Sequence, residues 1–213
     1  MALSEERKPI IGFGYNMGLN HLELIPDFFN AIENKQVLRF VYNVAYREKV
    51  EILFHPYYIK EYNGRWFVLG KSFDLGHKPL KYANIAIDRV DNVPAVMEEE
   101  YIPNNRVWEA HFTNIIGVTS GSKKKPVEIR IETSDTKTFF RIKTKPLHKS
   151  QKCLCEPNEA EGRRGMFSIN VIPNDEMYSL FLSYQTGMRV ISPSDIADEM
   201  KKRIEMMMQN YKM

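Results

Sequence analysis

The sequence predicts an α+β protein in which a helix and a small closed β-barrel precede a second α/β domain and a last helix. Apolar residues at helical spacing over 22–35 are followed by four stretches of strand composition, at about 37–46, 49–59, 65–72 and 82–90. Short, strongly twisted strands of this kind favour a closed barrel. From residue 127 onward the patterns follow the order β-α-β-β-α-β, which is typical of a ferredoxin-like domain.

Local signals place the ends of several helices. Pro26 suits the first turn of the first helix. Asn174 is a favourable N-cap for a helix that begins at Asp175. Ser192-Pro193 predicts that the last helix has a serine cap and a proline in its first helical position.

We expect four parts along the chain. Residues 1–21 contain glycines and no sustained period, which indicates an arm or linker. Residues 22–95 form the barrel domain. Residues 96–125 begin with three acids and a proline and are predicted to connect the domains, and residues 126–213 form the ferredoxin-like domain with the last helix.

The composition excludes several classes of protein. With 213 residues, 43% hydrophobic and 27% charged, the chain resembles an ordinary soluble globular protein, and it has no apolar run near the roughly 18 residues of a membrane span. The spacing of Cys153 and Cys155 suits neither a disulfide nor a metal site, which indicates free thiols and a cytoplasmic location. Because metal, cofactor and catalytic motifs are absent, we expect no cofactor, and a binding protein instead of an enzyme.

Basic residues gather in the barrel region. The net charge is only +3, but from Lys35 to Arg89 ten Lys/Arg stand against five Asp/Glu, whereas Asp91–Glu100 has four acids and no base. Local clustering of this kind indicates an anionic partner.

The most informative stretch is His55–Lys71, which predicts a β-hairpin around Asn63-Gly64. Alternation along its second strand places four side chains on one face: Arg65, Phe67, Leu69 and Lys71. Cations and rings on one face suit phosphate and base together, because guanidinium binds phosphate and a ring stacks on a base. The alternative is a barrel strand with charged ends and a packed tryptophan.

Several motifs resemble a known family. His55-Pro56, then Asn63-Gly64-Arg65 and Trp66-Phe67-Val68, resemble the WYL domain and its Trp-Tyr-Leu triplet, although Phe67 and Val68 replace the family's Tyr and Leu. Ile87-Asp88-Arg89-Val90 resembles that family's Leu-Asp-Arg-Ile strand. Ser179–Val190 resembles the C-terminal extension that often follows a WYL domain, so the resemblance runs from about Leu22 to the end.

The resemblance implies a fold and a function. It implies an Sm-like, SH3-type barrel and a ferredoxin-like extension, which together form the ligand-sensing module of a bacterial transcription regulator. The barrel is implied to bind single-stranded DNA or RNA, or a nucleotide effector. The implied ligand-binding residues are His55, Tyr57, Lys60, Arg65, Phe67, Lys71 and Arg89 of the barrel and His148 and Arg189 of the extension. The family's winged helix-turn-helix is expected to be absent, because only about 21 residues precede the first helix.

Three questions stay open at this point. The protein is alternatively a sensor of a small anionic metabolite, or a protein-interaction scaffold without a ligand. Arg89, expected at the end of an inward-facing row with Ile85 and Ile87, is either paired with Asp88 or Glu51 or held for a ligand anion. The apolar stripe of the last helix packs on its own domain or forms a homodimer interface; its members are Ile196, Met200, Ile204, Met207, Met208 and Tyr211.

Overall fold

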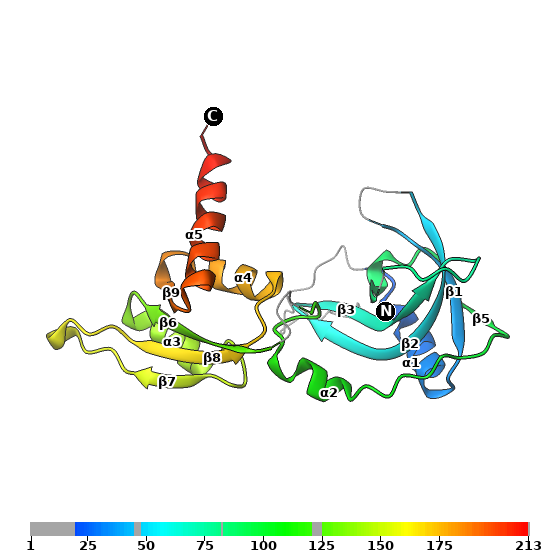
Figure 1. Cartoon of the computed structure of the whole chain (residues 1–213), viewed down its shortest axis with the longest axis horizontal. Helices are drawn as coiled ribbons and strands as arrows, with labels where there is room; N and C mark the ends of the chain where they lie inside the picture. The colour runs from blue at the N-terminus through cyan, green and yellow to red at the C-terminus, as the bar shows by residue number, and fades with distance from the viewer. Residues whose placement is uncertain (1–19, 45–47, 82, 121–124, 213) are drawn as a thin grey trace, which may run out of the picture. The chain divides into compact units, whose positions relative to one another are not determined.

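The computed structural model describes residues 20–44, 48–81, 83–120 and 125–212, so nearly all of the predicted N-terminal arm lies outside the described residues. The chain divides into two compact units, with the boundary between Asn104 and Asn105. Each unit contains one antiparallel sheet with helices, which confirms the α+β class (Figure 1).

The first unit is a five-stranded sheet preceded by a helix. A 3₁₀ turn, Leu22–Leu24, leads into α1 (Ile25–Glu33), which has Pro26 in its first turn as predicted. The strands are β1 (Val37–Tyr42), β2 (Val50–Tyr62), β3 (Arg65–Phe73), β4 (Asn84–Ala86) and β5 (Ala95–Met97). Their order in the sheet is β4-β3-β2-β1-β5, and every neighbouring pair is antiparallel.

The core of this unit lies between α1 and one face of the sheet. Phe28 of α1 meets Phe40 of β1 edge-to-face with ring centroids 5.6 Å apart, and Phe40 meets Phe54 of β2 in the same way at 5.8 Å. All three rings are fully buried, together with Ile52, Val68, Ile85 and Ile87. Burial of these side chains is the main favourable contribution to the stability of this unit.

The predicted hairpin is present. Tyr62 pairs with Arg65, and the two residues between them, Asn63 and Gly64, have φ of 52° and 79°. Both positive values belong to the tight turn whose twist matches that of the flanking strands, which explains the Asn-Gly pair.

The predicted strand at 82–90 is wrong beyond residue 86. β4 ends at Ala86, and Ile87–Arg89 form a 3₁₀ turn that the Val90 amide closes by donating to the Ile87 carbonyl at 3.0 Å. Ile87 and Val90 are both fully buried, three residues apart, which is the spacing of a 3₁₀ turn. Tyr82, the first residue of the predicted strand, lies outside the described residues.

The predicted closed barrel is not confirmed. β4 and β5 lie at the two edges of the sheet, and no ladder joins them within the described ranges. As the chain leaves the 3₁₀ turn it contacts β1 through an isolated bridge between Tyr42 and Val90 and through a hydrogen bond from the Asp91 amide to the Val41 carbonyl at 2.9 Å.

The second unit is a four-stranded sheet with two helices between its strands. After a short helix, α2 (Trp108–His111), the elements are β6 (Val127–Thr133), α3 (Thr136–Thr144), β7 (Lys152–Cys155), β8 (Met166–Val171), α4 (Asp175–Leu182), β9 (Met188–Ser192) and α5 (Ser194–Gln209). This is the predicted β-α-β-β-α-β order followed by a helix. The sheet order is β7-β8-β6-β9, antiparallel throughout.

The helix caps of the second unit agree with the sequence in one case and differ in another. The Asn174 side chain accepts from the Met177 amide at 2.8 Å and caps α4 as predicted. The last helix begins one residue later than predicted, at Ser194, and Pro193 occupies its N-cap position without a side-chain cap. Ser192 cannot serve as the cap because it is the last residue of β9, where it pairs with Arg130 of β6.

The segment predicted to connect the domains contributes to both units. Its first residues include part of β5, which pairs with β1. Its later residues include Phe112 and Ile116, which are buried in the second unit. The limits of the four predicted parts therefore stay a prediction. Within the described ranges, none of the helices has the length and apolar character needed to span a bilayer.

Gly70 lets β3 lie close to β2 beside the candidate site, and this generates a first prediction. A Cβ at this position would overlap the His55 carbonyl oxygen and the Phe54 ring. Gly70→Ala should therefore lower the free energy of unfolding of the first unit by about 1–3 kcal/mol. Urea denaturation followed by Trp66 fluorescence in a Trp108→Phe background measures the change.

The control is Gly76→Ala, because a Cβ there meets only the Asp74 side chain at 3.3 Å. It should change the free energy by no more than about 0.5 kcal/mol. Equal effects of the two substitutions would contradict the close approach of β3 to β2.

Candidate functional site

The candidate site is the face of the β2–β3 hairpin that turns away from the α1 core. Val68 and Trp66 belong to the core side, so the alternate residues of β3 lie on the other face, as predicted. The register pairs His55 with Lys71, Lys60 with Phe67 and Tyr62 with Arg65. We call this surface the hairpin face; its candidate ligand-binding residues are His55, Tyr57, Lys60, Arg65, Phe67 and Lys71. In two of these pairs, Lys60–Phe67 and Arg65–Tyr62, a cation on one strand therefore lies opposite an aromatic ring on the other.

A bulge in β2 shapes the inner part of this face. The register between β2 and β3 shifts between Pro56 and Tyr58, which leaves Tyr57 as the extra residue. A bulge bends its strand and turns side chains to new directions. As a result Tyr57 lies beside His55, and both rings contact the ring of Tyr101, each at a centroid distance of 5.8 Å.

The segment Glu99–Ile102, which we call the cover segment, buries the inner part of the hairpin face. The Ile102 amide donates to Nδ1 of His55 at 3.1 Å, and the Tyr57 hydroxyl donates to the Ile102 carbonyl at 2.9 Å. The Tyr101 hydroxyl donates to the Pro56 carbonyl at 2.6 Å. His55 is consequently only 4% exposed and Tyr57 8%.

Burial sets the protonation of both anchoring side chains. It lowers the pKa of His55 from its ordinary value; the positive charge of Lys71 and His77 acts in the same direction, and Glu99 opposes it. Burial also raises the pKa of Tyr57 to about 12, and Tyr101 adds to this. A neutral His55 accepts the Ile102 amide at Nδ1 and a neutral Tyr57 donates to the Ile102 carbonyl, so both states fit the hydrogen bonds observed.

The outer part of the hairpin face is open to solvent. Lys60, Arg65 and Phe67 are half-buried and Lys71 is exposed. Nη2 of Arg65 lies 3.1 Å from Oδ2 of Asp88, whose side chain is 9% exposed. The other carboxylate oxygen, Oδ1, is buried and has no hydrogen-bond partner. Asp88 thus fixes the guanidinium at the end of the hairpin.

Of the two alternatives considered for Arg89, the structure does not show the pairing with Asp88 or Glu51. Asp88 pairs with Arg65, and Glu51 pairs with Arg39 of β1 at 3.3 Å. Arg89 belongs to the 3₁₀ turn instead of an inward-facing strand row, which removes it from the alternation that motivated the prediction. It is half-buried and makes no ion pair with any residue that the structure describes.

The two site residues predicted in the extension belong to the second unit. Nδ1 of His148 lies 2.8 Å from the Ser150 hydroxyl. Nε of Arg189 donates to Oε2 of Glu132 at 2.7 Å, and Arg164 donates to the same oxygen at 3.2 Å. Burial would raise the pKa of Glu132, but the hydrogen bonds from the two arginines lower it overall.

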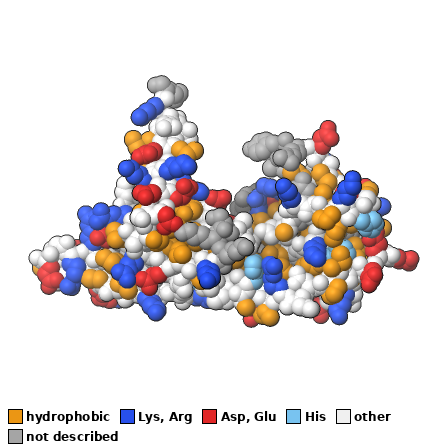
Figure 2. Space-filling view, viewed as in Figure 1, with side chains coloured by type: hydrophobic (Ala, Val, Ile, Leu, Met, Phe, Trp, Pro, Cys, Tyr) orange, Lys and Arg blue, Asp and Glu red, His pale blue; other side chains and the backbone are white. Residues whose placement is uncertain are grey.

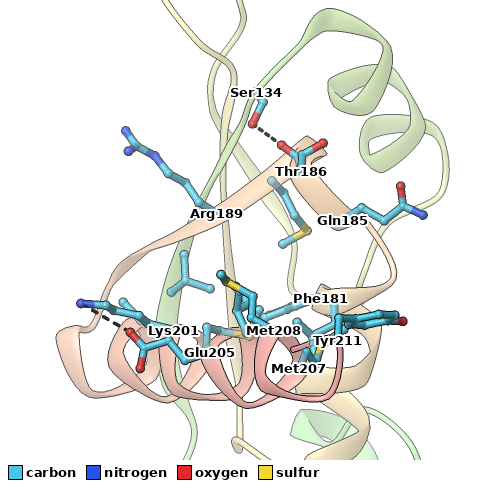
Figure 3. A pocket seen from close by; sticks show the side chains of 16 residues that line it. Ser134, Phe181, Gln185, Thr186, Arg189, Lys201, Glu205, Met207, Met208 and Tyr211 are labelled. Carbon is cyan, nitrogen blue, oxygen red and sulfur yellow. Dashed lines mark hydrogen bonds and ion pairs between the residues drawn. The ribbon is translucent and has the colours of Figure 1, made fainter. Parts of the chain in front are cut away.

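A groove of about 770 Å³ lies along α5 in the second unit (Figure 3). Its walls come from α5, β9 and the end of α4, and include Phe181, Met188, Met200, Ile204, Met207 and Tyr211. The prediction that the stripe of α5 packs on its own domain holds only for its beginning, because Ile196 is 2% exposed and Tyr211 is 84% exposed. In Figure 2, hydrophobic and charged side chains of both signs share the projecting part of this helix.

The comparisons with known proteins agree with the motifs. The family model described as "WYL domain" matches residues 23–93. The chain contains a WYL domain. The search of curated proteins gave no match.

Two solved structures are similar to most of the chain at low identity. Proteasome accessory factor B/C (PafBC) of Arthrobacter aurescens is 14% identical with a TM-score of 0.36, over 87% of this chain and 27% of that one. A CRISPR Cas-related protein is 17% identical with a TM-score of 0.43, over 89% of this chain and 50% of that one. This chain therefore spans about a quarter and about half of the lengths of the two proteins.

Sequence reasoning missed three residues that matter for the hairpin face. Asp88 was considered only as a partner of Arg89, and Tyr101 and Ile102 were assigned to a connecting segment. The available signal was the apolar pair directly after Glu98-Glu99-Glu100, because such a pair tends to be buried against something. Among the described residues there is no group of His, Cys, Asp and Glu that could hold a metal ion.

The Arg65–Asp88 pair generates a second prediction. Asp88→Asn keeps the shape of the side chain but removes the charge that holds Arg65, so the WYL domain should lose about 1–2 kcal/mol of stability. Glu51→Gln is the matched control; both side chains of its pair with Arg39 are exposed by more than 40%, so the loss should be below about 0.5 kcal/mol. Urea denaturation of both variants measures the difference, and a larger loss for Glu51→Gln would contradict the assignment.

Proposed function

We propose that this chain is the ligand-sensing module of a bacterial transcription regulator and works in the cytoplasm. In this proposal the hairpin face of the WYL domain binds single-stranded DNA or RNA, or a nucleotide effector, without catalysis. The observation that carries it is the cross-strand pairing of cations with rings, Lys60 with Phe67 and Tyr62 with Arg65, on a partly exposed surface.

Each residue of the outer hairpin face has a role in this proposal. The Arg65 guanidinium, oriented by Asp88, binds a phosphate through the N–H groups that the carboxylate does not use. Phe67 stacks on a base, which needs no hydroxyl and tolerates any base. Lys60 and Lys71 of this face, with Arg89 of the neighbouring 3₁₀ turn, add positive charge along the backbone of the ligand.

We also propose the finer fold assignments. The first unit is an Sm-like, SH3-type barrel that the described ladders leave open between β4 and β5, and the second is the family's ferredoxin-like extension. The sheet order β7-β8-β6-β9 supports the second assignment, since the two crossover connections place one strand between the pair that each connects. His148 and Arg189 are candidate contacts of this extension with nucleic acid.

Fluorescence anisotropy with a short labelled single-stranded oligonucleotide over a salt series tests the proposal. We expect saturable binding that weakens steeply with salt. Arg65→Ala/Arg89→Ala should abolish it, and Phe67→Ala should weaken it about tenfold or more by removing the stacking ring. Arg39→Ala, which removes an exposed arginine of β1, is the control and should bind like the wild type.

Other outcomes favour the alternatives. Saturation by a mononucleotide with little salt dependence would favour a sensor of a small anionic metabolite. No binding at low salt by a protein with an unchanged melting temperature would contradict nucleic-acid sensing and favour a protein-interaction scaffold.

A second copy of this chain is the partner that we propose for the groove along α5. Ala197, Met200, Ile204, Met207 and Tyr211 line it at alternating spacings of three and four, the seam of a helix that pairs with another helix. In an antiparallel pair Ile204 lies against Met207 of the second copy, and Met207 against Ile204. The same apolar surface then serves both copies, as a two-fold dimer requires.

Analytical ultracentrifugation checks this dimer. The wild type should associate with increasing concentration, and Ile204→Glu should be monomeric because it buries a charge in the seam. Met206→Glu is the control, since Met206 is exposed on α5 but does not line the groove. A wild type that stays monomeric at about 100 μM would contradict the dimer.

A further inference from the structure

The cover segment and the candidate ligand compete for the same side chains. His55 and Tyr57 are predicted to contact the ligand, yet both are occupied by the backbone of Ile102. We propose that the cover segment, Glu99–Ile102, is a displaceable strap that an anionic ligand of the hairpin face replaces by taking over His55 and Tyr57. This inference rests on the proposed function and adds a regulatory step to it.

The contacts that hold the strap are mostly polar. Three hydrogen bonds join it to β2, and the Tyr101 ring contacts His55 and Tyr57 through ring edges. Tyr101 and Ile102 are each half-buried. A ligand phosphate supplies acceptors that replace the Ile102 carbonyl at the Tyr57 hydroxyl, whereas no ligand replaces an apolar core. The strap is therefore held by hydrogen bonds that a polar ligand can replace.

The strap and an anion require opposite protonation of His55. Only a neutral ring accepts the Ile102 amide at Nδ1, because the protonated ring carries a hydrogen on both nitrogens. An anion is bound better by the charged ring. The groups that face His55 are Lys71 and His77, which disfavour its charge, Glu99 of the strap, which favours it, and the neutral phenols of Tyr57 and Tyr101.

The direction of the pH effect follows from the lowered pKa of His55. At a pH below about 6.5, the ordinary pKa of histidine, an exposed His55 binds a proton, whereas His55 under the closed strap stays neutral. Protons therefore favour the open strap. Above that value His55 is neutral in both states and the strap keeps its full stability. Ligand binding should therefore strengthen as the pH falls from 7.5 to 5.5.

The position of the strap gives its release a consequence. Ile102 is two residues before the boundary between the two units. Displacement of the strap adds its residues to the chain that joins the units, and each released residue adds up to about 3.5 Å of reach. Ligand occupancy of the WYL domain would be transmitted as a longer and freer connection.

Hydrogen exchange of the full chain tests the strap directly. Peptides that cover residues 98–104 are followed by mass spectrometry, with rates corrected for intrinsic exchange, at pH 5.5 and 7.5 and with and without the oligonucleotide. Without ligand, Tyr57→Phe should raise exchange at the strap about fivefold by removing one hydrogen bond. Tyr184→Phe, in the second unit, should leave it unchanged. Protection should fall at pH 5.5 in the wild type but not in His55→Gln, which cannot be protonated.

With the oligonucleotide, exchange should rise at the strap while it falls at residues 60–71. Tyr101→Phe, which removes the strap's own hydrogen bond to the Pro56 carbonyl and no proposed ligand contact, should bind the oligonucleotide at least as tightly as the wild type, because the strap no longer competes as strongly. Binding that leaves the strap fully protected would overturn the strap and leave the proposed function intact. If neither the wild type nor Tyr101→Phe binds the oligonucleotide, both the proposed function and ligand displacement are overturned. Ligand-free exchange that is independent of pH would remove the role of His55 as well.

Discussion

The antiparallel pairing of β2 with β3 is the constraint on which the first unit depends. The Asn63-Gly64 turn fixes the register, and because side chains alternate across a strand, the register decides which residues are buried. One face packs Phe54 and Val68 against α1 and β1. The other face then has to carry the cations and rings of the candidate site. A slip of one residue would exchange the two faces, so the core and the site are specified together.

Two local features of the backbone shape the candidate site on this pair of strands. Gly70 allows close approach at His55, and the bulge at Tyr57 turns an additional ring toward the cover segment. Histidine and tyrosine at these positions hold backbone groups of Ile102, which would otherwise be buried without partners. His55 and Tyr57 thus stabilise the cover segment and are also candidate ligand contacts. Because they cannot do both at once, we expect a ligand and the cover segment to exclude each other.

The second unit buries some of its apolar side chains in a core and exposes others on its last helix. Its strands and helices bury Ile131, Phe139 and Phe167 in a core, where the last two rings stack at 4.8 Å. The later turns of α5 extend beyond that core and expose Ile204, Met207 and Met208. Methionine adapts its shape to different partners at little cost, which suits an interaction surface better than a core.

The sequence by itself determined the features that depend on neighbouring residues. The hairpin, the beginning of α1, the Asn174 cap, the order of elements and the WYL motifs all follow from short-range patterns, since turn chemistry, capping and periodicity act within a few residues. The common face of Arg65, Phe67 and Lys71 follows from the same alternation.

Only the tertiary structure decided the contacts between distant segments. The end of β4 at Ala86, the choice of Arg65 over Arg89 as the partner of Asp88, and the burial of His55 under Ile102 each depend on distant parts of the chain. His55 and Ile102, for example, are 47 residues apart. Ile85 and Ile87 fit an alternating strand, whereas Ile87 and Val90 have the spacing of a 3₁₀ turn, so the sequence alone does not place the end of β4. A sequence offers each charged side chain several possible partners, and the packing of the chain decides which of them lies within reach.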